Sequence, residues 1–242
     1  MSAPLRFPPD VMLLAAGLGR RMLPLTQTRP KPLIEVAGRA LIDRVIDGAW
    51  AEGLLRFVVN THHHADQLQT HLRQFERLRP GISIAFSPEP ELLETGGGLK
   101  AALPLLATDP IMVINTDTFF VPGTDTPYAR MVESFAANQA DIVLLCVHPR
   151  RAVGFRRSHD FCLSPRGEIT NDTGAPVIYA GAALIARRLI EAAPDGKFSL
   201  TRLFDRALAD EKLYGVALDA PWLHVGDPQA LAEAEAALKV SA

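Results

Sequence analysis

A glycine-rich segment near the amino terminus is followed closely by basic side chains. It spans Leu14–Met22, and Lys31 comes soon after it, between two prolines. Small residues let a backbone approach a ligand closely, and successive N–H groups in such a turn form a nest for an anion. The flanking prolines restrict the backbone around Lys31. We therefore expect Arg20, Arg21 and Lys31 to bind a polyphosphate.

Two familiar phosphate-binding loops do not fit this segment. The dinucleotide-binding fingerprint needs a third glycine where Met22 stands, and the P-loop needs Gly-Lys-Ser/Thr, whereas Lys31 lies between prolines. The segment therefore predicts a polyphosphate site of another class.

Two further segments carry groups that suit a nucleotide. In Ser87–Gly98, Glu89 could accept hydrogen bonds from a base edge, and three glycines precede an expected helix. Asp117 follows an apolar strand, where a carboxylate beside a phosphate site is well placed for Mg²⁺. The alternative for both segments is an ordinary turn.

The apolar pattern predicts strands alternating with helices over the first half of the chain. Such alternation indicates parallel strands with crossover helices on both faces of a sheet. We expect strands at 11–16, 55–59, 82–86 and 111–114, and helices at 41–52, 65–75 and 99–106.

The second half predicts more strands and fewer helices. This pattern favours an α/β fold with a mixed, mostly parallel central sheet and a small β extension, in one domain over 1–242. We expect strands at 142–147, 154–155, 161–163, 177–183 and 213–218, and helices at 185–192, 200–208 and 228–238.

Composition excludes several classes of protein. The chain has 242 residues, 48% of them hydrophobic and 21% charged, with a net charge of −2. A disordered chain and a broad basic field for nucleic acid are therefore not expected. Two cysteines, Cys146 and Cys162, both in apolar runs, suggest buried thiols in a reducing cytoplasm. No signal peptide or apolar run of about 18 residues is seen, so we expect no membrane partner. The oligomeric state stays open.

Five segments together resemble the sugar-1-phosphate nucleotidyltransferase family. Their order and spacing fit from about Val11 to Leu238. The resemblance implies a Rossmann-like three-layer nucleotidyltransferase fold, with a nucleotide-binding part over about 11–120 and a sugar-binding part over about 121–242. It also implies a reaction that joins a nucleoside triphosphate to a sugar 1-phosphate and releases pyrophosphate. The segments are Leu14–Met22, Pro30–Leu33, Glu94–Gly98, Asn115–Asp117 and Trp222–Asp227.

The resemblance also implies roles for individual residues. Those expected to act on the reacting phosphates are Arg21, Lys31 and Asp117, with Asp117 as a metal ligand. Glu89 and Gly96 are expected at the base. Besides Arg21 and Lys31, the residues expected to hold the nucleotide are Ala15, Ala16, Gly17, Gly19, Glu89, Gly96 and Gly97. Those expected at the sugar are Asn115, Asn171 and Gly181.

One departure from the family affects the metal. The family usually ends its site with Trp-x-Asp-x-Gly, whose Asp is a second metal ligand, whereas His224 stands there in this chain. A neutral imidazole suits Mn²⁺ or Zn²⁺ better than Mg²⁺. We expect Mg²⁺, with Mn²⁺ as the alternative, held by Asp117 and His224. Alternatively, His224 bonds a phosphate, or Asp227 replaces the missing carboxylate.

The substrates are predicted only by the resemblance. The N-acetylmuramate-1-phosphate uridylyltransferases are the favoured branch, which implies UTP and the recycling of cell-wall sugars. The mannose-1-phosphate guanylyltransferases are the alternative. Two other classes are a glycosyltransferase, whose Asp-x-Asp motif is only half matched by Asn115–Asp117, and a non-catalytic sugar-nucleotide-binding protein, suggested by His224. Release of pyrophosphate would distinguish a nucleotidyltransferase from both of these other classes.

Overall fold

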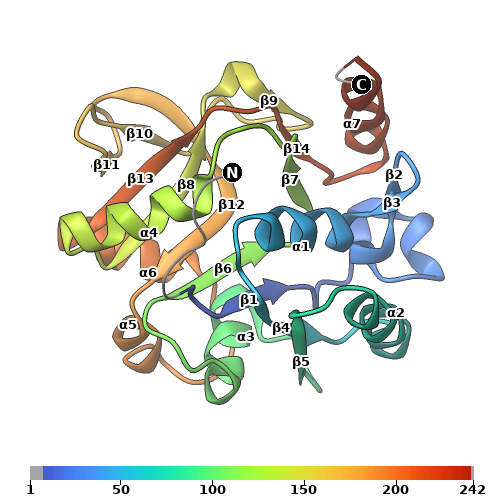
Figure 1. The fold of residues 1–242 in the computed structure, drawn as a ribbon. Coiled ribbons are helices and arrows are strands. Elements are labelled where there is room, and N and C mark those ends of the chain that lie inside the picture. The colour runs from blue at the N-terminus through green and yellow to red at the C-terminus, as the bar shows by residue number, and fades with distance from the viewer. Residues whose placement is uncertain (1–7, 241–242) are drawn as a thin grey trace.

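Four parallel strands form the first half of the central sheet. The computed structural model describes residues 8–240. The strands are β1 (Val11–Leu14), β4 (Arg56–Thr61), β5 (Ser83–Pro88) and β6 (Ile111–Asn115), in the spatial order β5-β4-β1-β6 (Figure 1). All of their pairings are parallel, as the alternating pattern predicts.

The strand order reverses at β1. From β1 the chain moves to β4 and β5 on one side, and then returns to β6 on the other side. In such sheets the loops after the two central strands diverge and leave a crevice at their carboxyl ends. The crevice between β1 and β6 is therefore where the topology favours a ligand.

The second half of the sheet is mixed. The long strand β12 (Ala175–Ile185) runs antiparallel to both of its neighbours, β6 and β8 (Ile142–Val147). Strand β13 (Leu213–Leu218) then pairs parallel with β8. Two short strands, β10 (Phe161–Leu163) and β11 (Ile169–Thr170), extend the sheet from the start of β12. The expected mostly parallel sheet with a small β extension is confirmed.

Helices cover both faces of the sheet and give the three expected layers. On α1 (Leu41–Ala51), Leu41, Val45, Ile46 and Ala49 lie on one buried face, which helical spacing predicts. The same core contains side chains from α2 (Ala65–Arg77), α4 (Pro127–Asn138) and α7 (Pro228–Val240). The opposite face is covered by α3 (Glu94–Ala102), α5 (Arg187–Glu191) and α6 (Thr201–Ala209).

Several short elements lie near the crevice. Strand β14 (Trp222–His224) pairs with β7 (Thr118–Phe120) and β9 (Ala152–Val153) in a small sheet. Strands β2 (Glu35–Val36) and β3 (Arg39–Ala40) form a hairpin. The short 3₁₀ turns are η1 (Arg20–Met22), η2 (Leu25–Gln27), η3 (Lys31–Leu33), η4 (Leu103–Leu105) and η5 (Pro149–Arg151).

The structure corrects three of the predicted boundaries and adds one helix. Helix α3 begins at Glu94, so Gly96–Gly98 lie inside it rather than before it. The strand expected at 154–155 lies at Ala152–Val153 instead. Ile185 ends β12 rather than starting α5. Helix α4 was not predicted, although a proline occupies its first turn and it buries Tyr128 and Met131. The sequence places Gly96–Gly98 before the helix because glycine has a low helix propensity, which tertiary packing overrides here.

Both cysteines are buried free thiols, as the sequence suggests. Burial raises the pKa of the Cys146 thiol, so it is protonated at neutral pH. Within residues 8–240, no helix is both long enough and apolar enough to span a bilayer.

A half-buried carboxyl links α1 to α4. Glu52 follows α1, and its Oε2 accepts a hydrogen bond from the Ala129 N–H in the first turn of α4, at 3.0 Å. Burial raises the pKa of Glu52 to about 7, although this N–H and Arg130 favour the charged form. Because the folded state binds this proton more tightly than the unfolded state, the free energy of unfolding falls as pH rises from about 4.5 to 7.

We predict that Glu52→Gln removes this pH dependence, because an amide keeps the acceptor oxygen without the charge. Between pH 4.5 and pH 8, the free energy of unfolding of the variant should rise by about 1–2 kcal/mol relative to that of the wild type, after allowance for solvent screening. Denaturant melts at both pH values measure this. Glu133→Gln, at an exposed carboxyl on α4, is the control. A difference that stays constant with pH would contradict the assignment.

Candidate active site

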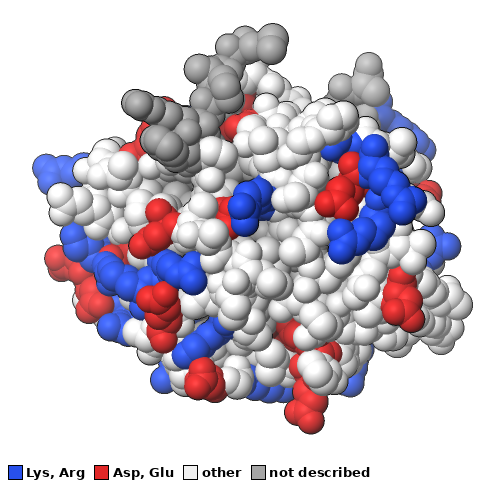
Figure 2. All heavy atoms as spheres, turned by 60° about the horizontal axis from the view of Figure 1, so that its bottom comes forward, with Lys and Arg blue, Asp and Glu red and all other residues white. Residues whose placement is uncertain are grey.

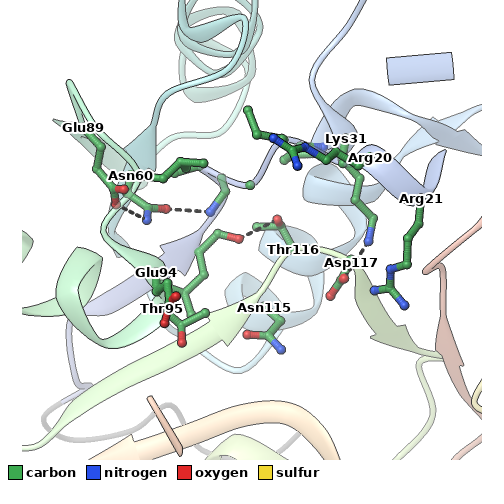
Figure 3. Close-up of a pocket in the computed structure, with 18 of the residues that line it drawn as sticks. Arg20, Arg21, Lys31, Asn60, Glu89, Glu94, Thr95, Asn115, Thr116 and Asp117 are labelled. Carbon is green, nitrogen blue, oxygen red and sulfur yellow. Dashed lines mark hydrogen bonds and ion pairs between the residues drawn. The ribbon is translucent and has the colours of Figure 1, made fainter. Parts of the chain in front are cut away.

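The largest group of expected site residues lines one cavity, of about 480 Å³, where β1 and β6 end (Figure 3). The cavity brings together the first loop, the β4 and β5 ends and the start of α3. The expected residues that line it are Ala15, Ala16, Gly17, Gly19, Arg21, Lys31, Glu89, Asn115 and Asp117. Gly96, Gly97, Asn171, Gly181 and His224 are absent from that lining within the described residues.

The glycine loop (residues 15–22) turns sharply at Gly19. This residue has φ +61°, in the left-handed region that favours glycine. A Cβ atom there would lie 2.8 Å from Thr26 Cγ2, so a side chain is excluded by contact as well as by conformation. The Thr26 hydroxyl donates to the Gly19 carbonyl oxygen at 2.9 Å. Gly17, by contrast, has open space around it.

Lys31 is fixed by its neighbours in the chain. It begins the 3₁₀ turn η3, with Pro30 before it and Pro32 within it. Its side chain is only 14% exposed, and Nζ lies 2.6 Å from Asp117 Oδ2. The turn therefore delivers an ammonium group to the carboxylate that follows β6.

Asp117 is charged because of this pairing. Burial opposes its ionisation, but the attraction and hydrogen bond of Lys31, with the charges of His224 and Arg21, hold the pKa of Asp117 below its ordinary value. Its backbone is anchored too, since the Asp117 carbonyl oxygen accepts from the Val225 N–H at 2.9 Å. The carboxylate stays negative at any pH near neutrality.

Two arginines complete the basic end of the cavity. Arg20 and Arg21 lie in η1, are exposed, and form no ion pair among residues 8–240. Figure 3 shows the Arg21 guanidinium and the Lys31 ammonium both beside the Asp117 carboxylate. On the face seen in Figure 2, basic and acidic side chains are interspersed. The positive charge available to an anion is therefore local to the cavity.

The far end of the cavity is arranged differently from the expectation. Glu89 is 4% exposed, and its two carboxylate oxygens accept from Asn60 Nδ2 and the Leu93 N–H, at 2.7 and 3.0 Å. The N–H groups of Gly96 and Gly97 both donate to the Phe198 carbonyl oxygen. Cβ atoms on these two glycines would overlap the Phe198 ring and the Gly196 carbonyl, so the glycines permit close packing of that segment on α3.

The residues expected at the sugar are scattered. Asn115 lines the cavity at the end of β6. Gly181 lies in β12 with φ +84°, and a Cβ there would lie 2.3 Å from Thr118 Oγ1 and 3.3 Å from the Asn115 Cβ. Its lack of a side chain makes room for these two residues. Asn171 is exposed in the turn after β11.

His224 and Asp227 lie close in the chain to Gly226, which lines the cavity, but do not line it themselves. The His224 ring stacks on Trp222, with 7° between their planes, and Nδ1 lies 3.3 Å from the Gly154 carbonyl oxygen. A carbonyl only accepts, so Nδ1 carries a proton and Nε2 is the atom left for a ligand. Asp227 Oδ1 accepts from the Ala230 N–H at 2.8 Å and caps α7. No cluster of three His, Cys, Asp or Glu suited to a metal occurs in the part of the chain described.

Sequence reasoning missed Asn60 and did not assign Thr116. Both are buried polar residues at the carboxyl ends of strands beside β1, and both line the cavity. The sequence does carry a signal for Asn60: it is the polar residue that follows the apolar run of β4, at the same edge of the sheet as the glycine loop.

The chain is similar to known proteins over most of its length. Residues 10–155 match the family described as nucleotidyl transferase. Over 235 residues the chain is 40% identical to N-acetylmuramate alpha-1-phosphate uridylyltransferase of Caulobacter vibrioides, covering 96% of this chain and 97% of that protein.

Two further similarities are more distant. A mannose-1-phosphate guanyltransferase of Yarrowia lipolytica is 28% identical over 90% of this chain and 61% of its own length. A crystal structure of UDP-glucose pyrophosphorylase complexed with UDP-glucose superposes with a TM-score of 0.78 at 14% identity, covering 98% of this chain and all of that one. At that identity the superposition shows the fold alone.

We predict that Gly19→Ala lowers the free energy of unfolding by about 1–3 kcal/mol, because it combines a left-handed backbone with a 2.8 Å contact. Gly17→Ala is the matched control: it lies in the same loop and adds its methyl group to open space. Thermal melts compare the two variants. Equal melting temperatures would show that the turn is not held as described.

Proposed function

The chain belongs to the nucleotidyl transferase family and is a sugar-1-phosphate nucleotidyltransferase, and on this premise we propose that it transfers uridylyl from UTP to N-acetylmuramate 1-phosphate. The observation that carries the proposal is the 40% identity, over nearly the full length of both chains, to a uridylyltransferase of that specificity. The guanylyltransferase alternative rests on 28% identity to a protein of which this chain covers 61%.

The reaction needs no nucleophile from the protein. A phosphate oxygen of the sugar 1-phosphate attacks the α-phosphorus of the triphosphate. The bond from that phosphorus to the oxygen bridging the α- and β-phosphates then breaks, and the electron pair leaves with pyrophosphate. Two anions must approach in line while charge grows on the leaving group, so positioning and electrostatic stabilisation supply the catalysis.

The cavity offers groups for each of these tasks. The glycine loop presents backbone close to the ligand, and Arg21 and Arg20 lie exposed beside it for the β- and γ-phosphates. Lys31 is placed for the α-phosphate, where the attack occurs. Its partner Asp117 holds the ammonium in the cavity before substrate arrives. Asn115, at the end of β6, is the candidate for contact with the sugar.

A divalent cation fits this cavity only together with substrate. Of the lining carboxylates, Glu89 is engaged by Asn60 and Leu93, and Glu94 Oε1 lies 3.7 Å from Lys197 Nζ. Asp117 is the carboxylate that lies among the cations. Mg²⁺ typically binds through one or two carboxylates and substrate phosphates, which matches a single protein carboxylate. Asp117 would hold the ion, with His224 Nε2 as a second ligand that favours Mn²⁺. When bound, the ion would offset charge on the phosphates.

The specificity test is a pyrophosphate-release assay. UTP, GTP, CTP and dTTP are each paired with the 1-phosphates of N-acetylmuramate, N-acetylglucosamine and mannose, with Mg²⁺ and Mn²⁺ compared. We expect the highest kcat/KM for UTP with N-acetylmuramate 1-phosphate. Turnover of GTP with mannose 1-phosphate above that of any UTP pair would replace the proposed substrates and keep the family assignment.

We predict that Lys31→Ala lowers kcat by about 10²–10³-fold, as the loss of a charge-stabilising donor does elsewhere, while the protein remains folded. Circular dichroism and a thermal melt check the fold, and steady-state assays give kcat. Lys239→Ala, at an exposed lysine on α7, is the control for removing one positive charge. Near-normal turnover by the Lys31 variant would show that this residue does not contribute to the reaction.

A further inference from the structure

The peptide group between Leu14 and Ala15 is held at both of its polar ends by side chains from neighbouring strands. The Thr116 hydroxyl, just after β6, donates to the Leu14 carbonyl oxygen at 2.8 Å. The Ala15 N–H donates to Asn60 Oδ1, in β4, at 2.6 Å. Because β1 lies between β4 and β6, these two bonds fix the peptide at which the chain leaves the sheet and enters the glycine loop (Figure 3).

The Asn60 amide is itself held by a carboxylate. Its Nδ2 donates to Glu89 Oε1 at 2.7 Å, and Glu89 Oε2 accepts from the Leu93 N–H, just before α3, at 3.0 Å. Asn60 is 3% exposed and Glu89 4%. The hydrogen bonds therefore run, shielded from water, from the start of α3 through the ends of β5 and β4 to the glycine loop.

The carboxylate decides which way the amide faces. An ionised carboxyl group only accepts hydrogen bonds, so Asn60 must turn its NH₂ toward Glu89. Its oxygen is then directed at the Ala15 N–H, which is a donor. Glu89 thus acts on the glycine loop through Asn60, although it does not touch the loop itself.

Close packing of α3 is part of the arrangement. A Cβ atom on Gly98 would lie 2.4 Å from Glu89 Oε1 and 2.8 Å from Asn60 Nδ2. A side chain at that position would push the two groups apart. The third glycine of the helix therefore serves this pair, whereas Gly96 and Gly97 serve the contact with Phe198.

We propose that Asn60 and Glu89 are positioning residues for the nucleotide: through the hydrogen bonds that join Glu89 to Asn60 and Asn60 to the Ala15 N–H, they fix the peptide from which the glycine loop departs. The sequence places Glu89 at the base; the proposal gives it a role through Asn60, because its two oxygens accept from Asn60 Nδ2 and the Leu93 N–H. The proposal rests on the proposed function in one respect, since it takes the glycine loop to hold the triphosphate.

Single substitutions should break the hydrogen bonds in a defined way. In Glu89→Gln, the amide has one acceptor oxygen for two donors, Asn60 Nδ2 and the Leu93 N–H. In Asn60→Asp, two carboxylates face each other. We expect each variant to raise KM for the nucleoside triphosphate by about tenfold or more, with KM for the sugar 1-phosphate changed by less than about threefold.

The double variant Asn60→Asp with Glu89→Gln restores every bond with the roles exchanged. Asp at 60 accepts from the Ala15 N–H and from the new Gln NH₂, while the Gln oxygen accepts from the Leu93 N–H. The total charge is also unchanged. We expect KM for the nucleotide to return to within about threefold of the wild type. Glu91→Gln, at an exposed carboxyl two residues further along the chain, is the control.

Alternative roles for the pair give different results. If the Glu89 carboxylate reads the base directly, the double variant will be as impaired as Glu89→Gln, and the proposal is overturned. If the pair serves stability alone, the single variants will melt at lower temperature but keep KM for the nucleotide once folded, which also overturns it.

A measurement without substrate tests the geometry separately. Hydrogen exchange of the Ala15 amide, followed by NMR, should be slow in the wild type and the double variant and at least about tenfold faster in either single variant. Equal exchange in all four proteins would refute the proposed hydrogen bonding. If the wild type uses a nucleotide other than UTP, the proposed substrates fail, and KM for the nucleotide actually used still tests the pair.

Discussion

The ion pair between Lys31 and Asp117 is the interaction on which the site depends. It joins the loop after β1 to the end of β6, across the crevice that the strand order opens. Nζ lies 2.6 Å from the Asp117 carboxylate, with the Lys31 side chain only 14% exposed, and the ammonium group holds the pKa of Asp117 below its ordinary value. In the proposed function, a triphosphate entering the cavity would meet an ammonium group already in position and would not have to order it.

The surrounding elements serve to hold that pair. The prolines on either side of Lys31 limit its backbone, and the left-handed turn at Gly19 brings the chain past it, with a Cβ there only 3.1 Å from the Lys31 Cβ. On the other side, the backbone of Asp117 is bonded to Val225 after β14, and β14 pairs with β7. The carboxyl-terminal part of the chain thus helps to place a residue of the nucleotide site.

Glycines near the cavity have distinct tasks that residue type alone does not separate. Gly19 adopts a left-handed backbone conformation, and Gly17 has open space around it. The glycines in α3 allow close packing, since side chains there would collide with Phe198, with the Gly196 carbonyl or with Glu89. This accounts for glycines in the middle of a helix, where their conformational entropy would otherwise favour alanine.

The sequence by itself determined the alternation of strands and helices, the parallel first half of the sheet, and most of the phosphate end of the site. These follow from local signals: apolar periodicity, a glycine-rich turn, and a lysine between prolines. Only the tertiary structure decided the roles of Asn60, Thr116 and Glu89, and the packing role of Gly96 and Gly97. The physical reason is that a buried polar group is defined by its partners. Apart from Leu93, four residues from Glu89, those partners lie 29 to 102 residues away in the chain and meet only where the strand ends come together.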